Sequence, residues 1–142
     1  MRSTYRVLAI LIAVVVVLQA ASIAFAWFDV LHAVDDGKAF SDIDDRNAGH
    51  DMHSIGAMLI ALLALLLLIV SFFAKIPGGV KWALIVFGVM LLQWVLAIVA
   101  FGVPAIGFLH GINALVLAGV AGRASGLAAQ ADTPASPTPT AA

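Results

Sequence analysis

The chain has 142 residues, of which 63% are hydrophobic and 11% are charged, and its formal net charge is −1. Soluble domains average about 45–50% apolar and about 25% charged residues, so a water-soluble fold of this size could not bury so much apolar surface. The absence of cysteine excludes disulfides, thiolate metal sites and cysteine nucleophiles. We therefore expect the lipid bilayer, and no nucleic acid, as the main partner.

Four apolar segments are each long enough to cross a bilayer as a helix, which requires roughly 20 residues. They are residues 7–30, 50–74, 81–103 and 105–123. Pro104 suits the first turn of the last segment, and residues 76–79 predict a tight turn. We predict an all-α integral membrane four-helix bundle in residues 1–128. Residues 129–142 are rich in alanine, proline, serine and threonine, which predicts a disordered cytoplasmic tail.

The basic residues predict the orientation in the membrane, because cytoplasmic flanks carry an excess of lysine and arginine. Most of them flank one side of the four spans, and the remainder lie on the other side, within the acidic segment of residues 29–52. The first group is Arg2, Arg6, Lys75, Lys81 and Arg123, and the second is Lys38 and Arg46. This excess predicts a multi-pass protein of the cell membrane with both termini in the cytoplasm.

A cleaved signal peptide is the alternative interpretation of the first span, since Ala24-Phe25-Ala26 resembles a cleavage site. However, the apolar run of residues 7–28 is longer than the roughly 7–15 residues of a typical signal-peptide core. The length favours a span that is retained in the protein.

The second half of the chain repeats features of the first half. Gln19 and Gln93 each follow a leucine within a span, and His53 and His110 each stand near the start of the next span. The sequence therefore predicts two repeated transmembrane hairpins, related by a pseudo-twofold axis along the membrane normal. On this prediction both histidines lie at the same depth, in the outer leaflet, and face the bundle axis.

Two symmetry-related histidines suit the two axial positions of a haem iron, because neutral imidazole is a strong iron ligand and bundles place such ligands on facing helices. A porphyrin is flat and needs small neighbours, and small residues stand one and two turns from each histidine. These are Ala57, Ala61, Ala114 and Ala118, with Gly56, Gly107 and Gly111 nearby. Gln19 and Gln93 lie deeper and are candidates to contact the edge of the cofactor.

A structural role is the alternative for these residues. Small residues at every fourth position also allow close helix packing in lipid, and a histidine or glutamine in a span can simply hydrogen-bond to a neighbouring helix. This interpretation predicts a non-enzymatic accessory or structural subunit without a cofactor.

The outer segment offers a further alternative, a metal site. His50 and His53 stand three residues apart, and acidic residues and another histidine stand on the preceding arm. These are Asp29, His32, Asp35 and Asp36. Carboxylate and imidazole together suit Zn²⁺ or Cu²⁺, so a metal-binding membrane protein is a second alternative.

The pattern of a glutamine in the first helix and a histidine at the start of the second, both repeated in the next hairpin, resembles one four-helix half of haem A synthase. The chain also looks like an uncharacterised family of small four-helix membrane proteins. The resemblance covers about residues 7–123 and implies that His53 and His110 ligate a b-type haem between spans two and four, near the outer face.

The chain differs from haem A synthase in two ways that restrict the function we expect. Ser54 and Gly111 stand where that family usually has a basic residue, and only one bundle is present. We therefore expect haem binding or electron transfer, and not haem A synthesis, with an unknown redox or membrane-protein partner. His32 and His50 have no counterpart in the second hairpin and are not expected to be ligands. Lys38 and Arg46 are the outer cations available to the haem propionates.

Overall fold

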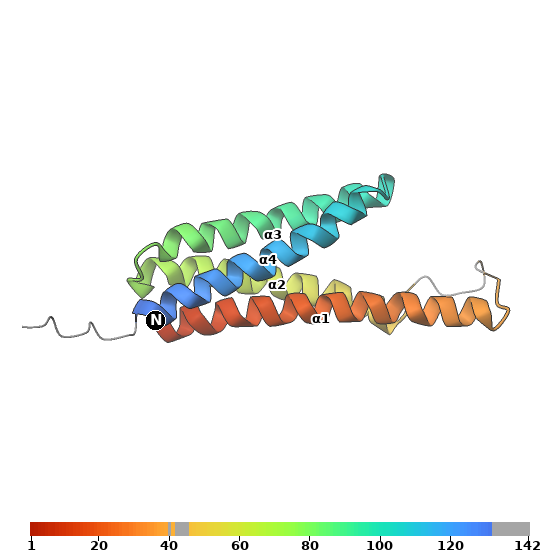
Figure 1. The fold of residues 1–142 in the computed structure, drawn as a ribbon, viewed down its shortest axis with the longest axis horizontal. Helices are drawn as coiled ribbons and strands as arrows, with labels where there is room; N and C mark the ends of the chain where they lie inside the picture. Colours follow the sequence, from red (N-terminus) through yellow and green to blue (C-terminus); the bar gives the residue numbers. More distant parts are fainter. Residues whose placement is uncertain (40, 42–45, 132–142) are drawn as a thin grey trace, which may run out of the picture.

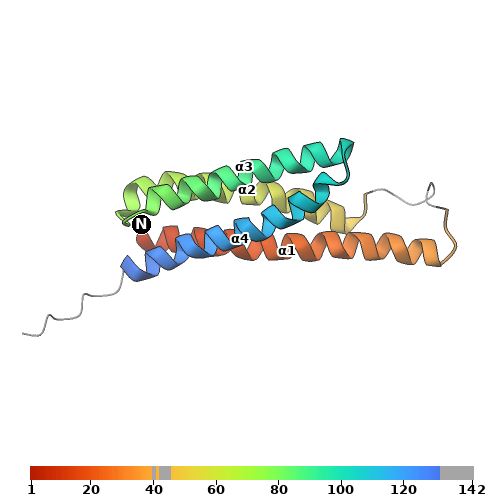
Figure 2. The same cartoon turned by 45° about the horizontal axis from the view of Figure 1, so that its top comes forward.

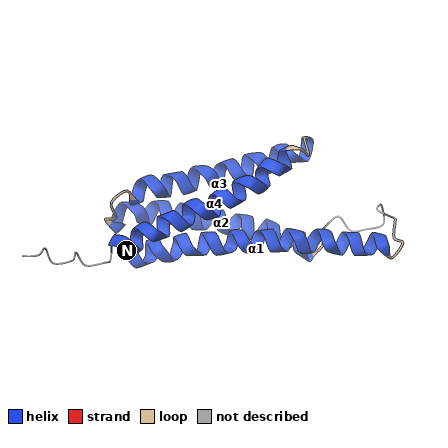
Figure 3. Cartoon of the chain, viewed as in Figure 1, coloured by secondary structure: helices blue, strands red, loops and turns tan. Residues whose placement is uncertain are grey.

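The chain folds into four helices and, in its described part, no strand, which confirms the all-α prediction (Figures 1 and 3). The computed structural model describes residues 1–39, 41 and 46–131. The helices are α1 (Arg2–Asp35), α2 (Ala48–Ala74), α3 (Gly79–Gly102) and α4 (Ile106–Ala131). Each of the four is long and apolar enough to cross a membrane.

The helices form an antiparallel bundle in which each helix packs against two neighbours. α1 packs on α2 and α4, and α3 packs on the same two helices, so α2 and α4 lie diagonally across the bundle. The N-terminus and the last turn of α4 lie at the same end of the bundle (Figures 1 and 2). At the opposite end, α1 extends beyond the turn that joins α3 to α4 (Figure 1).

Two helices continue past the ends that hydropathy predicted. α1 runs to Asp35 and α4 runs to Ala131, because the end of an apolar stretch need not be the end of a helix and alanine favours helix strongly. Residues 129–131, which we expected in the disordered tail, therefore belong to α4. The remainder of the predicted tail, residues 132–142, lies outside the described residues.

Asn47 begins α2 and attaches it to α1. Its side-chain oxygen accepts hydrogen bonds from the backbone N–H groups of Gly49 and His50, at 3.1 and 3.2 Å, which is the usual role of asparagine at an N-cap. Its amide nitrogen donates to the Ala26 carbonyl at 2.9 Å and to the Asp29 carboxylate at 3.0 Å. Asn47 therefore sets the height of α2 along α1, and with it the depth of the histidine that follows.

A tight turn joins α2 to α3, as we predicted from the sequence of residues 76–79. Lys75 and Gly78 adopt positive φ angles of 52° and 74°. The Arg2 guanidinium donates to the carbonyls of Lys75 and Ala131, at 3.4 and 3.0 Å. These carbonyls end α2 and α4, where the helix dipole favours a positive charge.

Buried positions recur in the same register in both hairpins. Each buried residue of α3 has a buried counterpart in α1. The separation along the chain within each pair is the same as that between Gln19 and Gln93. The pairs are Tyr5 with Gly79, Ala9 with Ala83, Ile12 with Val86 and Val16 with Met90. Every buried residue of α4 likewise lies as far beyond one of α2 as His110 lies beyond His53. The pairs are Gly56 with Asn113, Ile60 with Leu117, Ala64 with Ala121, Leu67 with Ala124 and Ser71 with Ala128.

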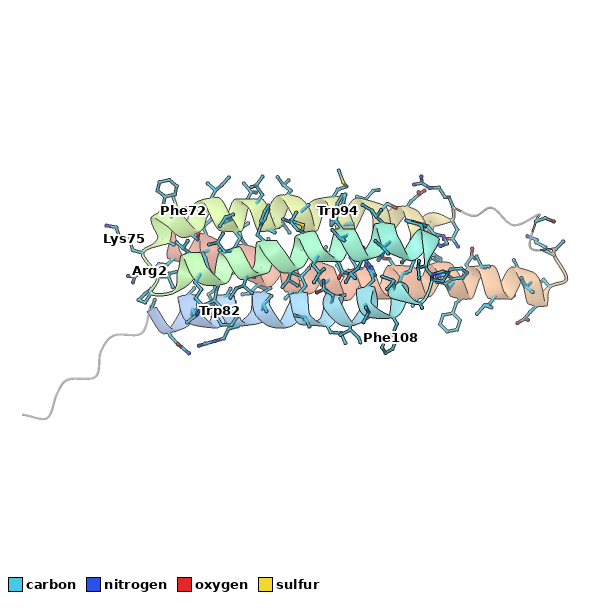
Figure 4. All side chains as sticks on the ribbon, turned by 90° about the horizontal axis from the view of Figure 1, so that it is seen from above. Arg2, Phe72, Lys75, Trp82, Trp94 and Phe108 are labelled. Carbon is cyan, nitrogen blue, oxygen red and sulfur yellow. The ribbon has the colours of Figure 1, made fainter. Side chains whose placement is uncertain are left out.

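Large apolar side chains cover the outside of the bundle. Phe101, Phe108 and Leu115 are 92%, 74% and 73% exposed, and Figure 4 shows Phe72 and Phe108 pointing away from the helices. Soluble monomers rarely expose apolar patches larger than a few hundred Å². The four helices are therefore compatible with a multi-pass membrane protein whose outer surface contacts lipid.

Candidate functional site

His53 and His110 face each other across the bundle. His53 lies in the second turn of α2 and His110 in the second turn of α4, and both side chains are half-buried. Their ring centroids are 6.3 Å apart, with 59° between the ring planes. Because α2 and α4 lie diagonally, the two rings meet between the α1–α2 hairpin and the α3–α4 hairpin. The structure thus brings together the two histidines that the sequence paired.

Each histidine is held by the backbone of the glutamine in its own hairpin. Nδ1 of His53 lies 3.1 Å from the Gln19 carbonyl oxygen, and Nδ1 of His110 lies 3.2 Å from the Gln93 carbonyl oxygen. A carbonyl oxygen only accepts hydrogen bonds, so in the neutral form of each ring Nδ1 is the protonated nitrogen and Nε2 is left with the lone pair. A histidine that binds a metal through Nε2 is ordinarily held in this tautomer by such a bond.

The side chain of Gln93 makes further hydrogen bonds around His110. Its Nε2 lies 3.1 Å from Nε2 of His110 and donates to the His110 carbonyl at 3.0 Å. Its Oε1 accepts a hydrogen bond of 2.7 Å from Nδ2 of Asn113, which also donates to the Val89 carbonyl at 3.0 Å. The amide of Gln93 is therefore held in one orientation, with its nitrogen toward the imidazole.

Asn113 is a site residue that the sequence interpretation missed. It is buried and lies one helical turn after His110 on α4, so its polar side chain at that spacing was an available signal. Its counterpart in the first hairpin is Gly56, which has no side chain to offer. A Cβ atom on Gly56 would lie 1.5 Å from Nε2 of Gln19, so the Gln19 side chain occupies the space over this glycine.

Gln19 is less well satisfied than Gln93. Its Nε2 donates to the Met52 carbonyl at 3.4 Å, and its Oε1 is buried without a hydrogen-bond partner. Most buried polar atoms of folded proteins are paired. Both glutamines lie beside the histidine pair, but only Gln93 is bonded to an imidazole through its side chain.

The separation of the two imidazoles is that expected of a pair of ligands on one haem iron. Two imidazoles that bind one iron from opposite sides have ring centroids roughly 6 Å apart, because each iron–nitrogen bond is about 2 Å and each nitrogen lies about 1 Å from its ring centroid. The separation of His53 and His110 is 6.3 Å. The alanines one and two turns beyond each histidine are half-buried on the same helix faces. They are Ala57, Ala61, Ala114 and Ala118.

Two features of the structure differ from what the haem prediction expects. Gly111 is exposed and a Cβ atom there would meet no described atom within 4 Å, because successive helical residues point about 100° apart. It therefore does not make room beside His110. The Gln93 amide stands at the nitrogen that the iron would bind, so this side chain must turn aside when a haem is held.

This chain matches no protein-family model, no curated protein and no solved structure. The resemblance to one half of haem A synthase and to small four-helix membrane proteins therefore stays a prediction, carried by the glutamine and histidine pairs.

The other histidines have different surroundings. His50 packs edge-on against Trp27, with ring centroids 5.9 Å apart, and its Nδ1 is buried without a hydrogen-bond partner. His32 is exposed, and its Nε2 lies 3.7 Å from the Asp36 carboxylate. In the described part of the chain, no three histidine or acidic side chains lie close enough together to hold a metal ion. The remaining acids of the outer segment, in residues 42–45, lie outside that part.

Lys38 and Arg46 stay candidates to pair with the propionates of the predicted haem. Nε of Arg46 donates to the Asp51 carboxylate at 3.1 Å, which places this guanidinium beside the first turn of α2. Lys38 follows the C-terminal end of α1.

Proposed function

We propose that this protein is a b-type haem protein of the membrane, with His53 and His110 as the axial ligands. One observation carries the proposal: each imidazole has its Nδ1 within hydrogen-bond distance of a backbone carbonyl, and the ring centroids are 6.3 Å apart. A haem ligated in this way would act as a one-electron carrier. The protein's own residues bind it, orient the ligands and keep lipid and water from the iron.

We also propose that the four helices cross the bilayer as two repeated hairpins, with both termini in the cytoplasm. The apolar exterior supports insertion, and the shared register of buried residues supports the repeat. The basic residues at the end that holds the N-terminus support the orientation. His53 and His110 then lie in the outer half of the membrane, where electrons can be exchanged with a partner at the outer surface.

Each residue of the site has a definite task in this proposal. The backbone carbonyls of Gln19 and Gln93 orient the two rings. The alanines on the same faces admit a flat ring. The proposed role of the haem is electron transfer.

The hydrogen bonds around His110 favour a second candidate function. Gln93, Asn113 and His110 satisfy one another without any ligand, as they would in a bundle where polar residues only attach helices to each other. On this alternative the protein is an accessory subunit without a cofactor.

Absorbance of the purified protein distinguishes the two. The chain is expressed in cells with ample haem and purified in a mild detergent, and haem is quantified against protein. The proposed function predicts a Soret band at about one haem per chain, and its loss in the double variant His53→Ala, His110→Ala. A wild-type protein that is colourless but folded by circular dichroism would support the accessory role.

A further inference from the structure

The two histidines differ in what occupies their second ring nitrogen. Gln93 contacts both nitrogens of His110. Its backbone carbonyl oxygen lies 3.2 Å from Nδ1, and its side-chain Nε2 lies 3.1 Å from Nε2 of the imidazole. Gln19 engages only Nδ1 of His53. Within the described residues, no atom hydrogen-bonds to Nε2 of His53. The nitrogen that would bind iron is therefore available on His53 and already occupied on His110.

The hydrogen bond at Nε2 of His110 depends on a second hydrogen bond, from Asn113 to Gln93, which has no equivalent in the described part of the first hairpin. Nδ2 of Asn113 can only donate, so the atom of Gln93 that it contacts at 2.7 Å must be the acceptor Oε1. The nitrogen of the same amide then faces His110. Gly56 takes the place of Asn113 in the first hairpin, so nothing there orients the Gln19 amide in the same way.

This difference makes the two ligands unequal. His110 must give up its hydrogen bond from Gln93 to bind iron, whereas His53 gives up none. One hydrogen bond of this kind shifts an equilibrium by roughly fivefold. A released His110 also has a ready partner, because Gln93 and Asn113 hold it in the arrangement that the structure shows.

Building on the proposed haem site, we propose that His53 is the permanent ligand and His110 is an exchangeable one, which a small neutral ligand of the carbon monoxide or nitric oxide class displaces. In the exchange, the bond between iron and Nε2 of His110 breaks and one bond to the incoming ligand forms. No electron is transferred, and His110 keeps its Nδ1 proton. Gln93 is a positioning residue that accommodates the released imidazole.

Carbon monoxide titration of the dithionite-reduced protein tests the proposal. The wild type binds carbon monoxide, with a shift of the Soret band. Gln93→Leu weakens this binding about fivefold, because the released His110 loses its partner, and the ferrous protein without carbon monoxide stays fully low-spin. The control variant Ser71→Ala removes a buried hydroxyl that donates to the Leu68 carbonyl within α2, about five helical turns beyond His53, and leaves the affinity unchanged. Asn113→Ala, a smaller change to the fold, weakens binding in the same direction as Gln93→Leu.

The single histidine variants give a second measurement that does not depend on Gln93. His110→Ala retains haem and binds carbon monoxide more tightly than the wild type, whereas His53→Ala loses haem. A wild type that has a low-spin Soret band but binds no carbon monoxide at one atmosphere contradicts this inference and leaves the haem site standing. Equal effects of Gln93→Leu and Ser71→Ala also contradict it, and a colourless wild type overturns both proposals.

Discussion

Gly49 of α2 lies against the backbone of α1, whereas Gly119 of α4 has open space beside it, so a change from glycine to alanine should have opposite effects at the two positions. A Cβ atom on Gly49 would lie 2.6 Å from the Ser22 carbonyl oxygen and 2.7 Å from the Ala26 backbone nitrogen. Backbone atoms cannot turn aside, so Gly49→Ala must move the two helices apart by on the order of 1 Å. Overpacking of this kind costs about 1–3 kcal/mol. At Gly119 of α4 the same added Cβ would meet no described atom within 4 Å.

The matched variant therefore has the opposite sign. Gly119→Ala should raise the free energy of unfolding by about 0.5–1 kcal/mol, because alanine loses less backbone entropy than glycine when a helix forms. Circular dichroism during unfolding in mixed micelles measures both variants under the same conditions. We expect the midpoint to fall for Gly49→Ala and to rise for Gly119→Ala. A neutral Gly49→Ala, or equal shifts in both variants, would refute the close approach of α1 and α2.

Three further predictions concern the frame around the site. Asn47→Ala should lower the free energy of unfolding by about 1–2 kcal/mol, since α2 loses its N-cap; micelle unfolding measures this, and a neutral result would contradict the cap. Tyr5→Phe should cost about 1 kcal/mol, because the buried hydroxyl donates to the Gly79 carbonyl at 2.9 Å, and an unchanged unfolding midpoint would argue against that bond. Reporter fusions at Ala141 and within residues 42–45 should report opposite sides of the membrane, and same-side reporters would end the four-span topology.

The sequence predicted the helices and the histidine pair because these depend on local chemistry. Long apolar segments define the four helices, and His53 and His110 stand out because histidine within such segments is rare and costly. Their meeting across the bundle followed from the predicted repeat. The helix ends were harder to place, since α1 continues through polar residues to Asp35, where a helix no longer needs an apolar sequence.

The inequality of the two histidines could not be predicted from the glutamine and histidine matches. It depends on the side-chain orientation of Gln93, which Asn113 fixes from the facing helix. The same position in the first hairpin is Gly56, so the repeat that reveals the histidines also hides this difference. Gly111 was misread for a related reason, because nearness to His110 in sequence says nothing about which helix face it occupies.

The low-spin absorbance spectrum of single histidine variants tests the haem site most directly. The site predicts that His53→Ala and His110→Ala each abolish the bis-imidazole spectrum of the wild type. His50→Ala should leave that spectrum nearly intact, since His50 packs against Trp27 and has no counterpart in the second hairpin. A bis-imidazole spectrum that persists in His110→Ala would contradict the pairing of His53 with His110.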